Sequence, residues 1–249
     1  MEYISATIIT YNEATRISEC LDSLRIGSLV DEIVVVDSGS TDDTAEICRR
    51  AGCRVYVRPF NGYGIQRQFA TSLTSNNFVI SIDADERLSA ELADAILAIK
   101  QKGFEHRVYA MPTDVYIMGR KVHTGEGVKT PIRLFNKRYA QWNLDDVGER
   151  LTFPTSLQPQ MLGGRLMHHR AADMDGLYSK ELHKASIAAG NAPADSVGAM
   201  TPALKGVKKF CKQYFSNRGF LDGAIGLTIA RTEARAVRDA YRQLRRKKS

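Results

Sequence analysis

The chain has 249 residues, 43% of them hydrophobic and 25% charged, which suits one large α/β domain or such a domain with an appendage. No stretch approaches the roughly 20 apolar residues that cross a bilayer, and the first residues lack the regions of a signal peptide, which argues against a membrane-spanning or secreted protein. The net charge of +7 is uneven, because residues 205–249 carry 13 Lys or Arg and three acids.

Strand-like and helix-like segments alternate over the first hundred residues. Apolar and β-branched runs at 4–10, 32–36, 54–57 and 78–82 predict strands, and the patterns at 13–25, 41–51, 64–74 and 89–101 predict helices. Ser40-Thr41-Asp42-Asp43 and Ser89-Ala90-Glu91 are N-cap signals for the second and fourth helices. Such alternation is typical of right-handed βαβ crossovers, so we expect a mostly parallel, Rossmann-like sheet with helices on both faces.

The pattern changes after about residue 105, where short apolar segments among turn residues predict short mixed strands. From Asp175 onward the sequence predicts helices near 177–189, 202–215 and 221–244. Apolar residues from Leu221 to Leu244 form one stripe, which favours packing in the core or in a homodimer, with membrane contact as a second use. The four scattered cysteines are expected to be reduced thiols in the core.

Polar side chains follow the predicted strands, at the edge where doubly wound sheets bind ligands. Thr10-Tyr11-Asn12-Glu13 stand where a Rossmann dehydrogenase or P-loop enzyme would have a glycine-rich phosphate loop, which argues against both. Asn12 and Glu13 suit hydrogen bonds to a ribose or base, or form an ordinary helix N-terminus. Asp37 leaves the second strand into a small-residue turn, where it either contacts a nucleoside or only caps the turn.

The fourth strand runs into Asp83-Ala84-Asp85-Glu86, which places three carboxylates within four positions. Burying one unpaired carboxylate costs several kcal/mol, so the cluster needs a cation, a hydrogen-bond network or water, and a divalent metal is the most economical answer. The third helix begins with Gly62-Tyr63-Gly64 and contains Arg67, which together form a candidate anion site for a diphosphate.

Taken together, these strand-end motifs resemble the family 2 glycosyltransferases, which have the GT-A nucleotide-diphospho-sugar transferase fold. Further segments look like the bacterial lipopolysaccharide-core β-1,4-glucosyltransferase group of that family: Gly64-Ile65-Gln66-Arg67-Gln68, Asp83-Ala84-Asp85-Glu86-Arg87, Ile132-Arg133-Leu134-Phe135 and Arg218-Gly219-Phe220-Leu221-Asp222-Gly223. The resemblance covers nearly the whole chain, strongly to about residue 90 and more loosely beyond. It implies a GT-A catalytic domain at 1–174, with a nucleotide-sugar half at 1–104 and an acceptor half at 105–174, followed by a basic helical extension at 175–249.

The resemblance also implies roles for the strand-end residues. The nucleotide-sugar donor, expected to be UDP-glucose, would contact Thr10, Tyr11, Asn12, Glu13, Asp37, Arg67, Asp83 and Ala84. Asp85 would be the main ligand of Mg²⁺ or Mn²⁺, and His168 is a further metal ligand or a structural histidine. The metal would neutralise the departing nucleoside diphosphate, with Arg67 and Arg133 sharing its charge.

An inverting transfer also needs a carboxylate that takes the proton of the acceptor hydroxyl. Related sequences carry Val-His-Glu at the corresponding place, whereas this chain has Val147-Gly148-Glu149. The resemblance therefore implies Glu149 as the catalytic base, with Asp145 and Asp146 as alternatives. Because Gly148 replaces the histidine of the related sequences, the resemblance identifies neither the orientation of the acceptor nor the acceptor itself.

The implied function is metal-dependent, inverting transfer of a hexose to a lipid-linked saccharide such as lipopolysaccharide core. The same fold acting on a polyprenyl phosphate is an alternative, and a sugar-nucleotide pyrophosphorylase is less favoured because residues 10–13 are not a glycine-rich basic loop. The basic C-terminal segment is either a solvated helical face or binds an anionic membrane surface, and no motif for nucleic acid supports that partner. We expect a cytoplasmic protein, free or on the inner face of the membrane.

Overall fold

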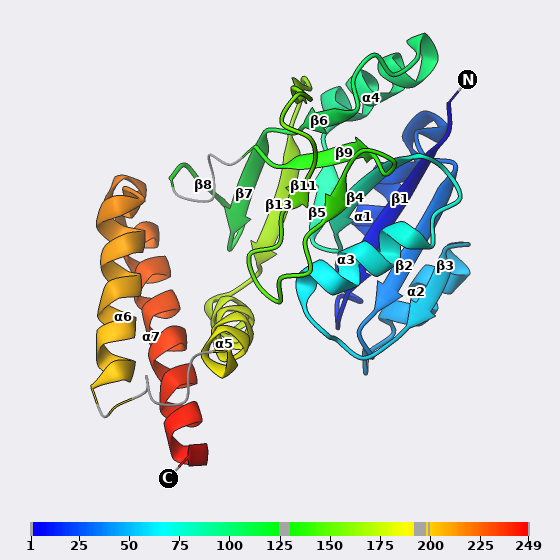
Figure 1. Ribbon diagram of the computed structural model, residues 1–249. Helices are drawn as coiled ribbons and strands as arrows, with labels where there is room; N and C mark the ends of the chain where they lie inside the picture. Colours follow the sequence, from blue (N-terminus) through cyan, green and yellow to red (C-terminus); the bar gives the residue numbers. More distant parts are fainter. Residues whose placement is uncertain (1, 125–129, 192–197, 199, 249) are drawn as a thin grey trace. The chain divides into compact units, whose positions relative to one another are not determined.

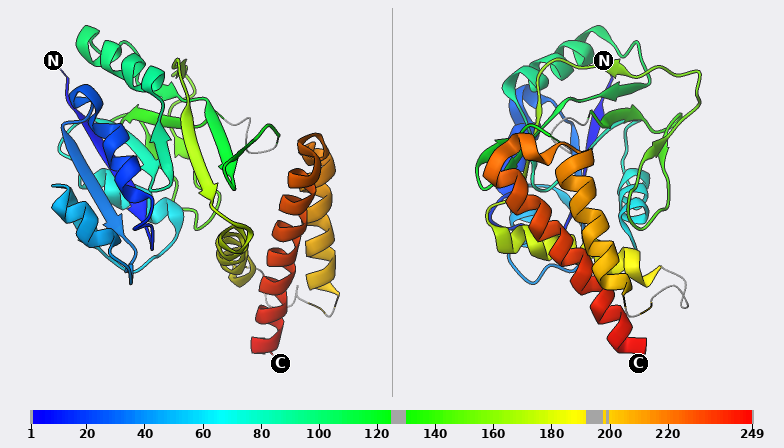
Figure 2. Two further views of the ribbon diagram at one scale, coloured as in Figure 1. Left: turned by 180° about the vertical axis from the view of Figure 1, so that it is seen from behind. Right: turned by 90° about the vertical axis from the view of Figure 1, so that its left-hand side faces the viewer.

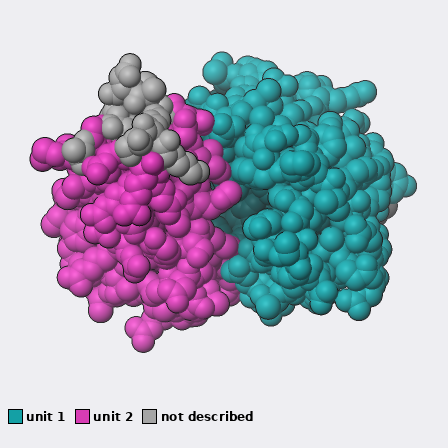
Figure 3. Space-filling view, turned by 90° about the horizontal axis from the view of Figure 1, so that it is seen from below, with its two compact units in different colours: residues 1–113, 130–168 teal, residues 114–129, 169–249 magenta. Residues whose placement is uncertain are grey.

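The computed structural model describes residues 2–124, 130–191, 198 and 200–248, with side chains up to residue 246 at the C-terminal end. The chain forms two compact units, which Figure 3 colours separately. Unit 1 comprises residues 1–113 and 130–168, and unit 2 comprises residues 114–129 and 169–249. The functional division at residues 104 and 174 stays a prediction.

A seven-stranded sheet with the order β12-β6-β9-β4-β1-β2-β3 forms the centre of unit 1 (Figure 1). Its parallel part consists of β1 (Ile4–Thr10), β2 (Glu32–Asp37), β3 (Arg54–Val57) and β4 (Phe78–Asp83). Three short strands extend the sheet beyond β4: β9 (Ile132–Asn136), β6 (Val108–Ala110) and β12 (Gln160–Met161). β9 runs antiparallel to both of its neighbours, β4 and β6, and β12 runs parallel to β6. The predicted parallel sheet and the mixed short strands after residue 105 are confirmed.

Helices cover both faces of this sheet, as predicted (Figures 1 and 2). The hydrophobic core of one face involves α1 (Ile17–Arg25), α2 (Thr44–Arg50) and α4 (Ala90–Lys102). On the other face, α3 (Tyr63–Ser72) packs against β1, β2 and β4. The alternation of side chains along a strand explains this division, because successive residues of β1 point to opposite faces.

The two expected N-caps have different outcomes. Ser89 caps α4, and its Oγ accepts a hydrogen bond of 3.2 Å from Leu92 N, which confirms the prediction. The prediction of a helix start at Ser40 or Thr41 is wrong, because α2 begins at Thr44. The backbone N–H of Ser40 donates instead to Asp37 Oδ2 at 2.8 Å, which holds this segment in a turn.

Smaller strands complete the architecture. In unit 1, β5 (Glu86–Leu88) pairs antiparallel with the first part of β13 (Leu166–Ala171), and β10 (Gln141–Trp142) pairs with β11 (Leu151–Thr152). In unit 2, β7 (Thr113–Ile117) pairs with β8 (Arg120–Val122). The pairing of β5 with β13 places His168 opposite Glu86.

Unit 2 contains the helical extension: α5 (Met174–Gly190), α6 (Thr201–Cys211), a π-helical turn η4 (Lys212–Ser216), a 3-10 turn η5 (Gly219–Asp222) and α7 (Gly223–Lys248). Helix α7 packs against both α5 and α6 (Figure 2). Ile229, Ala236 and Ala240 are buried, which confirms core packing for the centre of the predicted apolar stripe. Leu221 does not belong to it, because it precedes α7 and is 64% exposed. Among the described helices, none is long and apolar enough to cross a membrane.

All four cysteines are free. Cys20, Cys48 and Cys53 are buried, as expected of small core residues. Cys211 is exposed at the end of α6, so the prediction of a core position is wrong for this residue. Its side of α6 faces away from α7, which the local sequence does not reveal.

A buried ionic cluster joins β13 to the three long helices of unit 2. Arg170 Nη2 lies 2.5 Å from Glu181 Oε1 and 3.0 Å from Glu233 Oε1, and Lys209 Nζ lies 3.1 Å from Glu233 Oε2. Burial would raise the pKa of Glu181, but the charges of Arg170, Lys184 and Lys209 hold it below its usual value. The cluster therefore stabilises unit 2 with Glu181 ionised.

We expect Glu181→Gln to lower the free energy of unfolding by about 2 kcal/mol at pH 7, because a charged hydrogen bond inside the unit is lost. A carboxyl group with a lowered folded-state pKa stabilises the protein above its unfolded pKa and loses this effect as the pH falls through the folded value. The difference between the variant and the wild type should therefore shrink below about pH 4. Urea unfolding at pH 7 and pH 3 measures it, and an equal difference at both pH values would contradict the assignment.

Candidate active site

The predicted strand-end residues meet where the strand order of the sheet reverses. β1 pairs with β2 on one side and with β4 on the other, so that Thr10 lies opposite Asp37 and Ile9 opposite Asp83. Open α/β sheets bind ligands in the crevice outside the carboxyl ends of the strands at such a point. The structure thus brings the end residues of β1, β2 and β4 to one edge of the sheet.

The end of β1 is tied to the start of α2. Asn12 has a φ of 53°, and its Oδ1 accepts a hydrogen bond of 2.8 Å from Thr41 N. Glu13 is buried, its backbone N–H donates to Thr44 Oγ1 at 2.8 Å, and Arg16 Nη2 lies 2.5 Å from Glu13 Oε2. Thr10 is buried as well, whereas Tyr11 is 57% exposed. This segment is therefore an ordered helix N-terminus that presents one aromatic ring to solvent.

Asp37 at the end of β2 caps its own turn. Its Oδ2 accepts from Gly39 N at 3.0 Å and from Ser40 N at 2.8 Å, and its Oδ1 accepts from Ser40 Oγ at 2.5 Å. The carboxylate is buried, with the residue 1% exposed. Of the two roles that the sequence allows for Asp37, the structure shows turn capping. A nucleoside contact stays a prediction.

Two buried oxygens near these strand ends lack a hydrogen-bond partner within the described part of the chain. They are Thr10 Oγ1 and Gln66 Oε1, and the amide nitrogen of Gln66 donates to Ser38 Oγ at 3.1 Å. Because buried polar groups in native proteins are almost always paired, these atoms are suited to a ligand or an ordered water. Gln66 was not predicted as a site residue, although its polar side chain sits among buried positions of α3.

Two arginines offset the buried carboxylates of the Asp83–Glu86 cluster. Arg67 Nη2 lies 2.6 Å from Asp83 Oδ1, and Arg133 Nη2 lies 2.9 Å from Glu86 Oε1 and 3.5 Å from Asp83 Oδ2. Glu86 also accepts a hydrogen bond of 2.8 Å from Asp83 N. Arg67 and Arg133 thus supply the cations and hydrogen bonds that the buried Asp83 and Glu86 need, and a metal at Asp85 stays a prediction.

The pKa values of the acids in this network shift in different directions. Burial would raise the pKa of Asp83, but Arg67 and Arg133 hold it below its usual value. Burial raises the pKa of Glu86 above its usual value in spite of Arg133. Burial opposes the charge of Arg67, yet Asp83 and Glu149 raise its pKa above the ordinary arginine value. Arg67 is therefore a permanent buried cation between two carboxylates.

Asp85 and His168 form the part of the site that suits a metal ion. His168 Nε2 lies 3.4 Å from Asp85 Oδ1, because β13 brings the histidine to the loop that follows β4. Burial would lower the pKa of His168, but the charge of Asp85 raises it above its usual value. Within the described ranges, no group of three or more His, Cys, Asp or Glu side chains is placed to hold a metal. A carboxylate such as Asp85 is a ligand type of Mg²⁺, which usually takes further ligands from water and phosphates, so a metal at this place stays a prediction.

The glycine at the start of α3 allows close packing. The backbone N–H groups of Tyr63 and Gly64 donate to the carbonyls of Asp146 and Asp145, both at 3.0 Å. A Cβ atom at position 64 would lie 2.2 Å from Asn143 O. These two N–H groups are thus used by the 143–146 loop, and the expectation that they bind a diphosphate is wrong.

The same loop leads to Glu149. Arg67 Nε donates to Glu149 Oε1 at 3.2 Å, and the Glu149 side chain is 20% exposed. Gly148 has a φ of +84° with open space around it, a conformation that side chains other than glycine rarely adopt. A histidine at this position would be strained, so the observed backbone agrees with the departure from Val-His-Glu. Arg67 also lies over the ring of buried Trp142, with 5.0 Å from its Cζ to the ring centroid.

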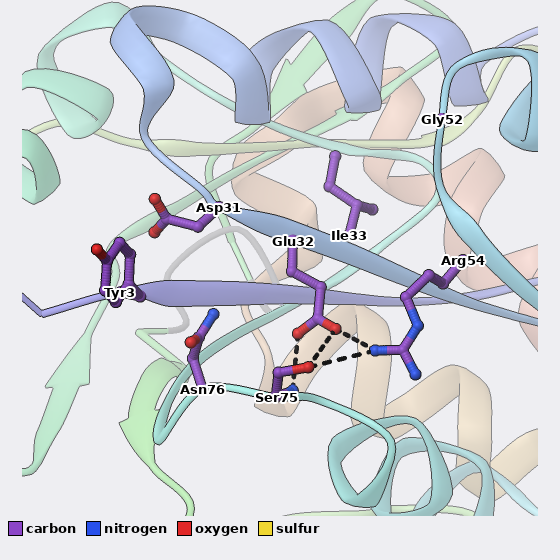
Figure 4. Close-up of a pocket in the computed structure, with 8 residues that line it drawn as sticks. All are labelled: Tyr3, Asp31, Glu32, Ile33, Gly52, Arg54, Ser75 and Asn76. Atoms are coloured by element: carbon purple, nitrogen blue, oxygen red, sulfur yellow. Dashed lines mark hydrogen bonds and ion pairs between the residues drawn. The ribbon is translucent and has the colours of Figure 1, made fainter.

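A cavity at the opposite edge of the sheet is not a second candidate (Figure 4). It has a volume of about 520 Å³ and lies at the amino ends of β1, β2 and β3. In Figure 4, the side chains of Glu32, Ser75 and Arg54 point toward one another, and Ser75 N and Oγ donate to Glu32 at 2.8 Å and 2.9 Å. Because these charged and polar groups satisfy each other, we interpret the cluster as structural.

Known proteins with similar sequences identify the family of the chain. A family model described as glycosyl transferase family 2 matches residues 5–153. The lipopolysaccharide core biosynthesis glycosyltransferase LpsC of Rhizobium meliloti is 31% identical over 247 residues, which is 93% of this chain and 87% of that protein. An uncharacterized glycosyltransferase of Rickettsia felis is 43% identical over 145 residues, which is 57% of this chain and 50% of that protein. The chain thus spans about half the length of the Rickettsia relatives that it matches.

Among solved structures, glucosyl-3-phosphoglycerate synthase from Mycobacterium tuberculosis was crystallised with Mn²⁺, UDP and glucosyl-3-phosphoglycerate. It is 26% identical and covers 47% of this chain and 44% of its own, with a TM-score of 0.37. The family match, in contrast, includes β1 to β4 and continues through Glu149. Because it spans more than half of the chain, and the resemblance of the strand-end motifs agrees with it, the chain belongs to glycosyltransferase family 2 and has the GT-A fold predicted with that family.

Proposed function

We propose that this protein transfers a hexose, glucose from UDP-glucose, to a lipid-linked saccharide such as lipopolysaccharide core, with inversion at the sugar carbon. The observation that carries the proposal is the link from Asp83 through Arg67 to Glu149, which joins a strand-end carboxylate of the donor edge to a separate carboxylate on a loop. The 31% identity to a lipopolysaccharide core glycosyltransferase over 93% of the chain supports the acceptor class.

The donor edge has groups that suit a nucleoside diphosphate. Asp85 and His168 would hold Mg²⁺ or Mn²⁺, and the metal, when bound, would neutralise the leaving diphosphate. Arg133 Nε is buried without a hydrogen-bond partner within the described residues, so this N–H is free to donate to a phosphate oxygen. Thr10 and Gln66 would receive hydrogen bonds from the nucleoside through their buried oxygens.

Glu149 would act as the base for the acceptor hydroxyl. Its Oε1 accepts from Arg67, which orients the carboxylate, and its Oε2 has no partner in the described part of the chain and would take the proton. Arg67 touches the base rather than the reacting atoms, so it is a positioning residue. A general base contributes most when its geometry is held in this way, because the proton is transferred over one hydrogen-bond distance.

A lipid-linked acceptor would place the enzyme at the cytoplasmic face of a membrane. The 13 basic residues beyond residue 204 support contact with an anionic surface, since each adds about 1 kcal/mol near anionic lipid. Polyprenyl phosphate is the alternative acceptor for the same fold. Incubation of the enzyme with UDP- or GDP-sugars and each acceptor class distinguishes the two by the product formed.

The donor site can be tested by thermal unfolding with UDP and Mn²⁺. At a UDP concentration of about 100 times Kd, ligand binding should stabilise the protein by about 2.7 kcal/mol, which corresponds to a rise in Tm of several degrees. Asp85→Ala should lose the part of this rise that depends on Mn²⁺. Asp94→Ala, which removes an exposed carboxylate on α4, is the matched control and should behave as the wild type. If UDP does not stabilise the wild type in the presence of Mn²⁺, or Asp85→Ala responds in full, the proposed donor site is wrong.

A further inference from the structure

Helix α6 exposes an apolar stripe on the side that faces away from α7. Leu204, Val207 and Phe215 are spaced by three and eight residues along α6 and η4 and are 62%, 61% and 58% exposed. The buried residues of the same segment, Pro202, Gly206 and Gln213, lie on the opposite side. Helix α6 packs against α7, as Figure 2 shows, so its buried side is already occupied. The exposed stripe therefore does not pack within unit 2.

The turn after α6 adds two further apolar side chains. Phe220 and Leu221 of η5 are 47% and 64% exposed. The turn is held in place, because Asp222 Oδ1 accepts a hydrogen bond of 2.9 Å from His123 N and Arg218 adopts a left-handed backbone with a φ of 58°. A non-glycine residue in this conformation costs about 1 kcal/mol or more and persists only where the surroundings impose it. Phe220 and Leu221 are thus presented to solvent by a fixed turn.

Basic side chains border these apolar residues. Lys208 and Lys212 are exposed beside the stripe of α6, and Arg218 is exposed next to Phe220. Between residues 200 and 221 the sequence has five Lys or Arg and no acid. No ion pair with a carboxylate is found for Lys208, Lys212 or Arg218 among the described residues. The segment therefore combines apolar side chains with uncompensated positive charge.

We propose that this surface, which we call the α6 surface (Leu204, Val207, Phe215, Phe220 and Leu221 with Lys208, Lys212 and Arg218), docks on an anionic lipid bilayer. An interfacial helix buries its apolar side chains at the boundary of headgroups and acyl chains, while Lys and Arg contact anionic headgroups. A second copy of the chain fits less well, since it would bring the same positive charges together. The docking itself is inferred from the α6 surface. Only its use, which is to bring the enzyme to a lipid-linked acceptor, rests on the proposed function.

The sequence predicts membrane contact from the basic residues of 205–249 as a whole, whereas the α6 surface uses only three of them together with five apolar side chains. The charges of residues 242–248 require only electrostatic attraction, whereas Phe220 and Leu221 require insertion among the lipids. The side chains of Lys247 and Lys248 lie outside the described residues. Apolar substitutions should therefore weaken binding if Phe220 and Leu221 insert among the lipids, and should leave it unchanged if the protein binds by electrostatic attraction alone.

Flotation of the full-length protein with vesicles tests the proposal. We expect binding to vesicles of phosphatidylcholine with a quarter phosphatidylglycerol, and much weaker binding to phosphatidylcholine alone. Phe220→Ser with Leu221→Ser should weaken binding at least tenfold, and Lys208→Gln with Lys212→Gln should weaken it about 25-fold, at about fivefold for each charge. The matched control is Val57→Ser with Met161→Ser, two exposed apolar residues of unit 1, which should bind as the wild type. In Phe220→Trp, tryptophan emission should shift to the blue only with the anionic vesicles.

Several results would overturn the proposal. They are an absence of binding to anionic vesicles, binding unchanged by the α6 variants, and loss of binding in Arg245→Gln with Arg246→Gln alone. A dimer in solution that Leu204→Ser with Val207→Ser converts to monomer would show that the α6 surface joins two copies instead. Stabilisation by UDP and Mn²⁺ is measured on every variant, because a variant that keeps it is folded. Failure of vesicle binding with intact UDP binding then overturns this inference alone.

Discussion

Glu149→Gln should lower kcat by about 10²–10⁴-fold, the usual contribution of a general base, and leave the affinity for UDP unchanged. The amide keeps the shape of the side chain and can still accept from Arg67 Nε through its oxygen, but it cannot take a proton. Steady-state kinetics with the donor in excess would show the loss in kcat. Thermal stabilisation by UDP and Mn²⁺ would show that the donor site is intact.

The neighbouring acids of the loop provide the matched comparison. Asp145 and Asp146 hold α3 through their backbone carbonyls, so Asp145→Asn and Asp146→Asn keep these contacts. Each variant should retain kcat within a few-fold of the wild type. Loss of turnover in either of them, together with activity in Glu149→Gln, would transfer the role of base to that residue.

The parallel part of the sheet and the position of the site could be predicted from the sequence. Strands β1, β2 and β4 are short apolar runs that end in polar residues, and this local pattern places the strand ends without knowledge of distant contacts. The crossover rule makes these strands parallel, so their carboxyl ends are expected at one edge of the sheet. Asp37 and Asp83 were therefore placed at one edge correctly.

The partners of the carboxylates could not be predicted in the same way. Arg133 reaches Glu86 because β9 inserts next to β4, and His168 reaches Asp85 because β13 pairs with β5. Such pairings of residues far apart in the sequence depend on the order of strands in the sheet. The sequence predicts different roles for Asp83 and Asp85, but it does not predict that Arg67 and Arg133 pair with Asp83 and Glu86 or that His168 lies beside Asp85.

The glycines illustrate a second limit of the sequence. Gly-Tyr-Gly at a helix N-terminus is compatible with both an anion site and a close contact with another segment. Only the structure shows that the carbonyls of Asp145 and Asp146 occupy the N–H groups at this place. The contact also has a functional consequence, because the loop that packs on α3 is the loop that carries Glu149.

Arg67→Met should destabilise the protein by about 3 kcal/mol, the lower end of the range for breaking a buried ion pair. Methionine preserves the volume of the side chain, but it leaves Asp83 and Glu149 without the cation between them. The effect lies at the lower end because Asp83 keeps Arg133 as a partner and both carboxylates are partly exposed. Urea unfolding measures the change, and Arg49→Met, which removes an exposed pair with Glu46, should cost at most about 1 kcal/mol.

A double-mutant cycle separates the lost charge of Arg67 from its lost packing against Trp142. If uncompensated charge is the main cost, Asp83→Asn should destabilise the Arg67→Met protein much less than it destabilises the wild type, because the Arg67 cation that this change would leave without a partner is already absent. If packing is the main cost, the two changes should add. Additivity would mean that Arg67 only supports the core, and the link from Asp83 to Glu149 would then give no reason to place the base at Glu149. A strong coupling, together with a fall in kcat that exceeds any change in KM, would show that the guanidinium of Arg67 positions Asp83 and Glu149 relative to each other.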